Sequence, residues 1–529
     1  MKKYFAKETF AYDLKSGFTL FLIALPLSIG IAIASGAPAS AGLLAAIVGG
    51  MLGSILGANE LAINGPAAGL IIVILGAVDS MGAGNGSLGF RYTLASICAA
   101  GIIQIMMGIF RLASLGLAFP SAVIHGMLSA IGAIIIAKQI PVIFGVKVVT
   151  KSIFGLFIGI PQYISNLNPQ VAFIGIASLV ILFGLPLISH KLASKLPVPL
   201  IVVAFGIIVG KYFDLEHHHI VRFWNWKAEV GESSLLNVPV NIKGSILFPN
   251  FSMFFTFKNL VAVMSIAIIA SIESVLSTFA VDKLDHQKRI SDLNRDLASK
   301  GLCNTILGLI GGLPVITEIV RSSANISNGA KTRASNFLHG LFILIFLALF
   351  PELLHEIPLS ALAAILMFVG WRLAHPSQFK HAYQVGPDHV LVFCITFLTT
   401  LATDLLVGVA VGVLSELVIG VYHGVQIKDL LGLNYKEINN EKLVELEIES
   451  SLVFVNSLKL RKLIESYLSS GQSLVVSIAK SRFVDHTVFD LLDRYKVAFR
   501  EKKLDFRIDT GGLLQPLSKH PLASQRRKA

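Results

Sequence analysis

The chain has 529 residues, of which 54% are hydrophobic and only 14% charged, and its mean hydropathy is +0.73. This apolar excess excludes an ordinary soluble enzyme, in which about half of the residues are apolar and about a quarter are charged. The net charge of +12 would suggest nucleic acid binding in a soluble protein, but the basic residues here lie between apolar segments. We therefore attribute them to membrane topology and expect no nucleic acid partner.

Charged residues are distributed unevenly along the chain. Residues 16–210 contain nine, whereas the last 104 residues, from Gln426 onward, contain 31. This contrast predicts a polytopic helical membrane protein with a water-soluble C-terminal domain. We expect a cytoplasmic N-terminus at 1–15, a transmembrane domain at 16–425, a linker at 426–440, a soluble domain at 441–520 and a frayed basic tail at 521–529.

Fourteen apolar segments are predicted in the membrane domain, separated by Gly, Pro or charged residues. Seven lie in the first half, at 18–35, 41–57, 66–78, 91–110, 120–138, 169–187 and 197–210. Seven lie in the second half, at 258–281, 297–311, 314–322, 334–350, 357–373, 389–402 and 404–425. No small-residue cleavage site follows the basic N-terminus, so we interpret it as cytoplasmic and not as a signal peptide.

The third segment of each half is too short to cross a bilayer, which suggests an inverted repeat of residues 16–210 and 251–425. NGPAAGLIIV at 64–73 aligns with GGLPVITEIV at 311–320, and in both a Gly and a Pro precede a short helix. Seven segments in each half would make the two repeats antiparallel. With two exceptions, Lys and Arg concentrate in the links predicted to face the cytoplasm.

The pattern changes after residue 440. Residues 442–456 alternate like a strand, LKLRKLIESYLSS has the pattern of an amphipathic helix, and SLVVSIA that of a short buried strand. A turn, a second helix and a further strand, LDFRID, follow. Strands that alternate with helices predict a small α/β domain of about 80 residues.

The two short helices carry the strongest functional signal. Gly65 and Pro66 in one half, and Gly312 and Pro314 in the other, break the chain so that unpaired N–H groups and the positive ends of helix dipoles lie at membrane depth. Two facing helix N-termini would make an anion site. The alternative is that these residues only permit kinks, as Pro often does in membrane helices.

Acidic residues inside the apolar segments are the next candidates. Glu273 lies in the middle of the eighth segment, where a carboxylate is costly, and Ser277 follows one turn later on the same face. Together they would hold Na+, or Glu273 would take a proton; a structural hydrogen bond is the alternative. Glu318 and Arg321 are three residues apart and would form an ion pair, or Arg321 would attract a bound anion.

Other polar residues favour structural interpretations. Asp404 fits a helix N-cap. The histidine run at 217–219 lies in a polar outer loop, which favours a solvated loop over a metal site. His125 and Lys138, in the fifth segment, are interpreted as interfacial or structurally paired.

No enzyme is expected from this sequence. It contains no phosphate loop, no metal-ligand cluster with useful spacing and no serine elbow. The three cysteines are widely spaced in apolar surroundings, which predicts neither a disulfide framework nor a metal pair: Cys98, Cys303 and Cys394.

These motifs resemble the sulfate permease (SulP) family of anion transporters over nearly the whole chain. The resemblance is carried by ALPLSIGIAIASGAPASAGLLAAIVGG, INGPAAGL, SIESVLSTFAVDK and GGLPVITEIVRSSANISNGAKTRASN. The last stretch is the most specific, because RSxxNxxxGxxT is spelled by Arg321, Ser322, Asn325, Gly329 and Thr332. The C-terminal region is similar to a STAS domain, whose Asp and Ser/Thr turn corresponds to VDHT at 484–487.

The resemblance implies 14 segments in two inverted repeats, with a core domain that moves against a gate domain in an elevator-like cycle. It implies a homodimer in a bacterial inner membrane, with the N-terminus and the STAS domain cytoplasmic and a cytoplasmic protein as a partner of that domain. The substrate-binding residues that it implies are Pro26, Leu27, Gly65, Pro66, Ala67, Ala68, Pro314, Val315, Ile316, Thr317 and Arg321.

The resemblance also assigns the cation and regulatory residues. Glu273 and Ser277 match the cation-coordinating acid and hydroxyl of bicarbonate-type members. Glu318 has no such match in the family, and we interpret it as a second proton site or as a charge that repels a dianion. Asp485 and Thr487 match the regulatory turn of the STAS domain, although a helix cap is the simpler interpretation of Thr487.

Two departures from the family pattern bear on the substrate. Leu27 follows Pro26 where many sulfate-type members have Gln, and Glu318 adds a negative charge that would repel a dianion. We expect uptake of sulfate or bicarbonate coupled to Na+ or H+, with no other cofactor. The alternatives are a STAS-regulated channel or exchanger for chloride or dicarboxylates, and a nucleobase-type transporter of the same fold.

Overall fold

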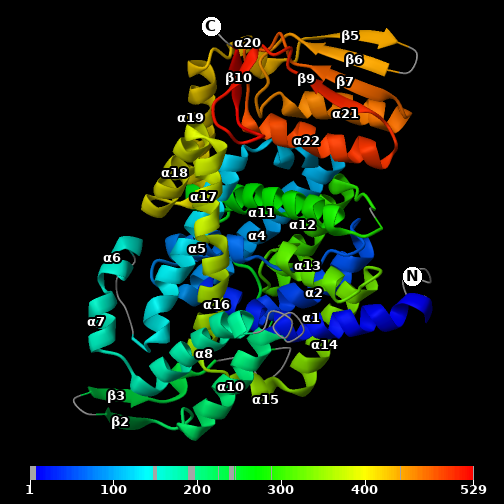
Figure 1. The fold of residues 1–529 in the computed structure, drawn as a ribbon. Helices are drawn as coiled ribbons and strands as arrows, with labels where there is room; N and C mark the ends of the chain where they lie inside the picture. The colour runs from blue at the N-terminus through cyan, green and yellow to red at the C-terminus, as the bar shows by residue number, and fades with distance from the viewer. Residues whose placement is uncertain are drawn as a thin grey trace. The chain divides into compact units, whose positions relative to one another are not determined.

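The computed structural model describes residues 7–146, 152–188, 197–223, 226–236, 244, 246–287, 289–440 and 443–527 (Figure 1). The chain forms two compact units, one of Met1–Gly116 with Ile131–Leu373 and the other of Leu117–Ala130 with Ala374–Ala529. The first unit consists mainly of apolar helices. The second combines apolar helices with a mixed α/β region.

Apolar helices dominate the first four-fifths of the described chain. Eight are long and apolar enough to cross a membrane: α1 (Lys7–Ala34), α2 (Ala39–Leu56), α4 (Gly86–Ile109), α5 (Ser121–Ile143), α8 (Pro169–Ile188), α11 (Phe257–Leu284), α16 (Leu359–Leu373) continued by α17 (Pro376–Val385), and α19 (Leu405–Tyr422). Four are shorter: α3 (Ile71–Gly82) with the 3-10 turn Ala68–Leu70 before it, α10 (Val198–Tyr212), α14 (Ala334–Leu349) and α18 (Pro387–Ala402). The protein is therefore a polytopic helical membrane protein.

Two helices depart from the simple apolar pattern. α12 (Leu293–Ile310) and α13 (Ile319–Ser327) lie where the ninth and tenth segments are expected, but neither meets the criteria of length and hydropathy for a span. α12 carries charged residues in its first half, and α13 has only nine residues because a short strand, β4 (Val315–Thr317), precedes it. Both helices contribute buried polar side chains to the centre of the first unit.

Short elements connect the long helices. They are α6 (Ile153–Ile158), α7 (Ile160–Ser165), α15 (Pro351–His355), α20 (Ile427–Leu431), the 3-10 turns Ala113–Ala118 and Glu232–Ser234, and the hairpin strands β2 (His219–Phe223) and β3 (Trp226–Val230). The hairpin occupies the region that the sequence predicts as a polar loop. The expectation of a loop was therefore wrong for these residues, because the two strands pair with each other.

Glycine permits very close packing between two pairs of helices in the first unit. On α4 and α12, a Cβ added to Gly101 would lie 2.5 Å from Thr305 N, and one added to Gly301 would lie 2.6 Å from Gly101 O. On α2 and α14, a Cβ added to Gly50 would lie 2.7 Å from the Cα of Gly340. Small residues of this kind let helix backbones approach in membranes, where van der Waals packing replaces the hydrophobic effect as the driving force.

The C-terminal region of the second unit contains two sheets. The first has the order β5 (Tyr435–Asn440), β6 (Leu443–Ile448), β7 (Ser473–Ser477) and β9 (Phe506–Asp509), with β6, β7 and β9 parallel and β5 antiparallel. The helices α21 (Ser457–Ser470) and α22 (His486–Glu501) share an apolar core with these strands. The second sheet has the order β10 (Leu514–Pro516), β11 (Gln525–Arg527) and β8 (Phe483–Val484). The predicted mixed α/β domain is confirmed.

Its boundaries differ from those expected. β5 pairs with β6, so the domain begins inside the expected linker at 426–440. β11 pairs with both β8 and β10, so three residues of the expected frayed tail at 521–529, Gln525–Arg527, belong to a sheet. Both differences arise because pairing with another strand orders segments whose own sequence is polar, β5 by pairing with the next strand and β11 by pairing with β8 and β10.

Replacing Gly101 by Ala should destabilise the protein. The new Cβ meets backbone atoms of α12 that cannot move without separating the helices, and overpacking of this kind costs about 1–3 kcal/mol. Gly76→Ala is the matched control, since Gly76 is also helical but has no atom within 4 Å of an added Cβ. Thermal unfolding in detergent should give a lower Tm for Gly101→Ala only. Equal Tm values for the two variants would contradict the close packing.

Candidate functional site

Two three-residue strands meet at the centre of the first unit. β1 (Asn64–Pro66) pairs antiparallel with β4, with Asn64 opposite Thr317, Gly65 opposite Ile316 and Pro66 opposite Val315. All six residues are buried. β1 leads through Ala67 into the Ala68–Leu70 turn and α3, and β4 leads through Glu318 into α13. The pairing therefore brings the starts of two helices together from sequence positions about 250 residues apart.

The N-terminal ends of these two helices lack side-chain caps. No side chain accepts a hydrogen bond from the first turn at Ala67, Leu70 or Glu318 in the described structure. Glu318 instead donates its backbone N–H to Ile63 O at 2.8 Å and extends the ladder by one bond. Free N–H groups and aligned peptide dipoles give each helix start a positive potential that attracts an anion.

Asparagine side chains complete the outer edges of the strand pair. Asn304 Oδ1 accepts from Val315 N at 2.6 Å, and Asn304 Nδ2 donates to Gln104 Oε1 at 2.7 Å. On the other edge Asn336 Oδ1 accepts from Asn64 N at 3.2 Å. These amides satisfy backbone groups that have no water partner in a membrane interior, where an unpaired group is costly.

Glu273 of α11 reaches the start of the third segment. Its side chain is 8% exposed, and Oε1 is buried without a hydrogen-bond partner among the described residues. A Cβ added to Gly69 would lie 1.8 Å from that Oε1, so the carboxylate rests directly against the Gly69 backbone. The neighbouring Ser274 Oγ accepts from Thr317 N at 3.2 Å, which links α11 to β4 as well.

Ser277 does not take part in this contact. It is half-buried and its hydroxyl makes no hydrogen bond within the described part of the chain, whereas the next residue, Thr278, is fully buried. Thr278 Oγ1 lies 3.0 Å from Thr317 Oγ1 and 2.8 Å from Asp296 Oδ2. In this conformation Thr278, and not Ser277, is the α11 hydroxyl that contacts β4.

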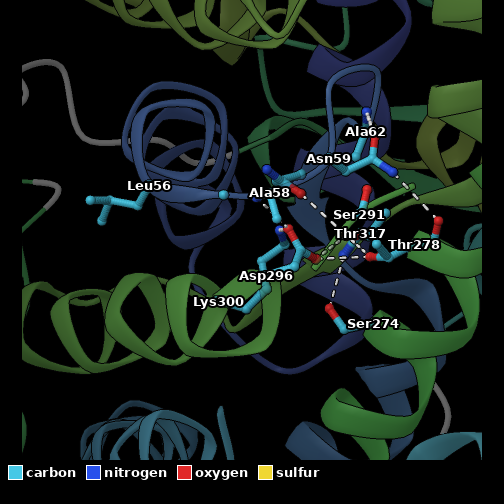
Figure 2. Close-up of polar contacts among 12 residues, drawn as sticks. Leu56, Ala58, Asn59, Ala62, Ser274, Thr278, Ser291, Asp296, Lys300 and Thr317 are labelled. Carbon is cyan, nitrogen blue, oxygen red and sulfur yellow. Dashed lines mark hydrogen bonds and ion pairs between the residues drawn. The ribbon is translucent and has the colours of Figure 1, made fainter. Parts of the chain in front are cut away.

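A buried ion pair supports the strand pair from α12 (Figure 2). Asp296 Oδ1 lies 2.9 Å from Lys300 Nζ, and both side chains are almost completely buried. The same carboxylate accepts from Ala58 N at 3.3 Å and from Thr278 Oγ1. Sequence reasoning missed this pair, although its spacing of four residues on one helix was a usable signal.

Arg321 lies across the other face of β1. It is 2% exposed, Nη1 donates to Ser28 Oγ at 3.4 Å, and a Cβ added to Gly65 would lie 2.5 Å from Nη1. Its Nε and Glu318 Oε1 are buried without hydrogen-bond partners, and the two side chains form no ion pair within the described residues. Ser28 follows Pro26 and Leu27 on α1, so the guanidinium contacts the segment of α1 that the sequence assigns to the substrate.

The two residues expected to be regulatory lie at the start of α22. Asp485 is the N-cap: Oδ1 accepts from Val488 N at 2.8 Å and Oδ2 from Phe454 N at 2.5 Å. Burial raises the pKa of Asp485 to about 7, and the backbone N–H groups that it accepts from oppose that rise. Thr487 Oγ1 accepts from Ser121 N at 3.5 Å, so this hydroxyl contacts the first residue of α5.

Several structural interpretations are confirmed. Asp404 caps α19 by accepting from Val407 N at 3.0 Å. The cysteines at 98, 303 and 394 are free. Of the histidine run, His217 is exposed and lies 2.7 Å from Asp214, whereas His219 is the first residue of β2. The Trp224 that adjoins this histidine run lies outside the described residues.

Comparison with known proteins gives consistent results. The pattern of the sulfate permease family matches residues 10–396. A putative sulfate transporter of Bacillus subtilis, YvdB, is 27% identical over 413 residues, which cover 78% of this chain and 73% of the relative. The bicarbonate transporter BicA of a Picosynechococcus species is 25% identical over 404 residues, which cover 76% and 68%.

Solved structures show the same fold. The transmembrane domain of a cyanobacterial bicarbonate transporter BicA aligns with a TM-score of 0.63 at 24% identity, covering 77% of this chain and 98% of that one. The structure of SLC26A9 aligns with a TM-score of 0.69 at 16% identity, covering 96% and 85%.

Removing one member of the Asp296–Lys300 pair should destabilise the first unit. Lys300→Met leaves a buried carboxylate without its cation, which costs about 3–5 kcal/mol. Adding Asp296→Asn removes that unpaired charge, so the double variant should unfold at a higher temperature than Lys300→Met alone. Thermal unfolding of both variants in detergent measures this. A double variant less stable than the single one would show that the charge of Asp296 is not the cause.

Proposed function

The chain belongs to the sulfate permease family of membrane anion transporters, and from this premise we propose how it binds and moves its substrate. It is an integral membrane protein that transports a small inorganic anion, sulfate or bicarbonate, and it is not an enzyme. We infer that transport is secondary and active, and that the anion binds where β1 and β4 bring the starts of α3 and α13 together. That strand pairing is the single observation that carries the proposal.

The positive groups at this point are suited to an anion. Two uncapped helix starts provide N–H donors, and the Arg321 guanidinium beside Gly65 adds a full positive charge with an unpartnered Nε. The other residues of the site belong to the same strands and turns or, for Pro26 and Leu27, to the α1 segment next to Ser28. They are Pro66, Ala67, Ala68, Pro314, Val315, Ile316 and Thr317.

The charge balance favours bicarbonate over sulfate. Glu273 and Glu318 bring two carboxyl groups to the region, against the single guanidinium of Arg321, while Asp296 and Lys300 compensate each other. A dianion would add to an existing excess of negative charge in a low-dielectric surrounding, where repulsion is strong. A monoanion accompanied by a cation leaves a smaller imbalance, so bicarbonate matches the site better.

Glu273 is proposed as the coupling site. Its unpartnered Oε1 against Gly69 lies at the start of the third segment, so Na+ or H+ bound there neutralises a charge beside the anion. Ser277, one turn along α11, would supply a further oxygen to Na+ after a rotamer change, and Glu318 would serve as a second proton site. Binding of the cation and of the anion would then be mutually favourable, as symport requires.

We further propose the family architecture for the whole membrane domain. Fourteen segments would form two inverted repeats, 16–210 and 251–425, and the anion site would move with the core in an elevator-like cycle. The antiparallel pairing of β1 with β4 and the matching glycine contacts of α2 with α14 and of α4 with α12 support this repeat. The N-terminus and the STAS domain would face the cytoplasm of a bacterial cell, the chain would form a homodimer, and a cytoplasmic protein would bind the STAS domain.

Glu273→Gln should remove the driving force for uptake. The amide keeps the shape of the side chain but neither ionises nor attracts Na+, so uptake into proteoliposomes should no longer respond to an imposed Na+ or pH gradient. Glu352→Gln, which alters an exposed carboxylate on α15, is the control and should respond normally. Gradient-driven uptake by Glu273→Gln at the normal rate would refute coupling through this residue, and unsaturable current that follows voltage would favour a channel.

Arg321→Gln should weaken anion binding. Loss of a charge-assisted contact of about 1.5–3 kcal/mol raises the KM for bicarbonate about tenfold or more. Gly65→Ala should have a similar effect, because its Cβ would displace the guanidinium. Gly86→Ala is the control, since that position has no neighbour within 4 Å. An unchanged KM for labelled bicarbonate uptake in Arg321→Gln would place the anion elsewhere.

A further inference from the structure

Five histidines gather in the second unit, from segments far apart in the sequence. His125 of α5, His381 of α17 and His389 of α18 each present a ring nitrogen, and these three atoms all lie within 4.8 Å of one another. His486, the first residue of α22, follows with its ring centroid 4.9 Å from that of His389. His520, in the connection between β10 and β11, lies with its ring centroid 5.8 Å from that of His381.

The protein itself leaves key nitrogens of this cluster unsatisfied. His381 Nδ1 and His389 Nε2 are buried and have no hydrogen-bond partner among the described residues. His389 is 6% exposed, so water does not readily replace the missing partner. Buried polar side-chain atoms are nearly always hydrogen-bonded in proteins, and exceptions commonly mark an absent water, ion or ligand.

The hydrogen bonds of the two histidines from the soluble domain separate their roles. His486 Nδ1 lies 2.6 Å from Leu522 O, so Nδ1 carries the proton and Nε2 keeps a free lone pair. A metal-bound histidine usually has this arrangement, with its other ring N–H donated to a carbonyl. His520 Nδ1 accepts from Leu522 N at 3.2 Å, so its proton is on Nε2 and it is a donor instead of a ligand.

We propose that His125, His381 and His389 bind a transition-metal ion of the Zn2+ type, with His486 Nε2 as the fourth ligand. Neutral imidazole nitrogens are suitable ligands for Zn2+, which prefers four ligands in a tetrahedron at about 2.0–2.1 Å. That geometry separates ligand atoms by ~3.4 Å. Small side-chain rotations would therefore bring the three nitrogens from their present separations to this tetrahedral spacing.

A metal at this point would join the membrane helices of the second unit to its α/β region. Two ligands come from the N-terminal turns of α5 and α18, one from the middle of α17, and the fourth from the first turn of α22. The Asp490 carboxylate, one turn after His486 on α22, interacts electrostatically with that imidazole, and Asp490 is also paired with Arg494. The ion would thus fix the start of α22 against α18, next to the contact between Thr487 and Ser121.

Zinc titration of the full chain tests the proposal. The purified protein in detergent, stripped with EDTA, should bind one Zn2+ per chain in calorimetry, and Co2+ should give the visible absorption of a tetrahedral site. His389→Gln should weaken Zn2+ binding about tenfold or more and abolish the Co2+ spectrum. His217→Gln, which alters an exposed histidine of the outer loop, is the matched control and should bind like the original chain.

The stability of the unmodified protein provides an independent readout. A ligand that binds only the folded state raises the Tm as its concentration rises, so Zn2+ should raise the Tm and EDTA should reverse the rise. His125→Gln and His381→Gln should each reduce this response, which keeps the test valid if His389→Gln does not fold. The proposal is overturned if the unmodified chain shows no Zn2+-dependent rise in Tm, or if His217→Gln removes the binding and His389→Gln does not.

Discussion

The pairing of β1 with β4 is the interaction on which the rest of the first unit depends. A backbone that is neither helical nor in a closed barrel is tolerated at membrane depth only where the protein satisfies its N–H and C=O groups. Here the two strands satisfy each other on the inner edge, and Asn304 and Asn336 do so on the outer edges. Because both strands end at this point, two helices begin there with free N–H groups. The proposed anion site would thus arise from the same strand pairing that satisfies the backbone groups at the break in the helices.

The sequence predicted the parts of this site better than their assembly. Gly65, Pro66 and Pro314 marked both breaks, and the scarcity of charge in the apolar segments singled out Glu273. The register of β1 with β4 was not predictable, because three-residue strands form only through a partner about 250 residues away. The same reason explains why the sequence favoured Ser277, whereas packing of α11 turns Thr278 toward Thr317.

Contacts between polar residues were the other feature that the sequence did not predict. Asp296 and Lys300 have a spacing that is visible in the sequence, but their burial depends on the packing of α12 against α4 and α2. The sequence singled out His125 only as a structural residue and did not connect it with the histidines at 381 and 389, because their ring nitrogens approach only after three helices have packed. In the soluble domain, alternation of apolar residues identified the strands β6 and β7, whereas β11 was missed because its sequence is basic and its order comes from β8 and β10.

Gly69 connects the proposed choice of coupling cation with the proposed choice of transported anion. Its Cα carries no side chain, and the space that a side chain would need is filled by the carboxyl group of Glu273. A larger residue at this position would push the carboxyl group away from the helix start, and a shorter acid at position 273 would leave the glycine uncovered. In the proposed mechanism the choice of driving ion and the choice of cargo therefore cannot change independently in descendants of this chain, because the same few atoms contribute to both sites.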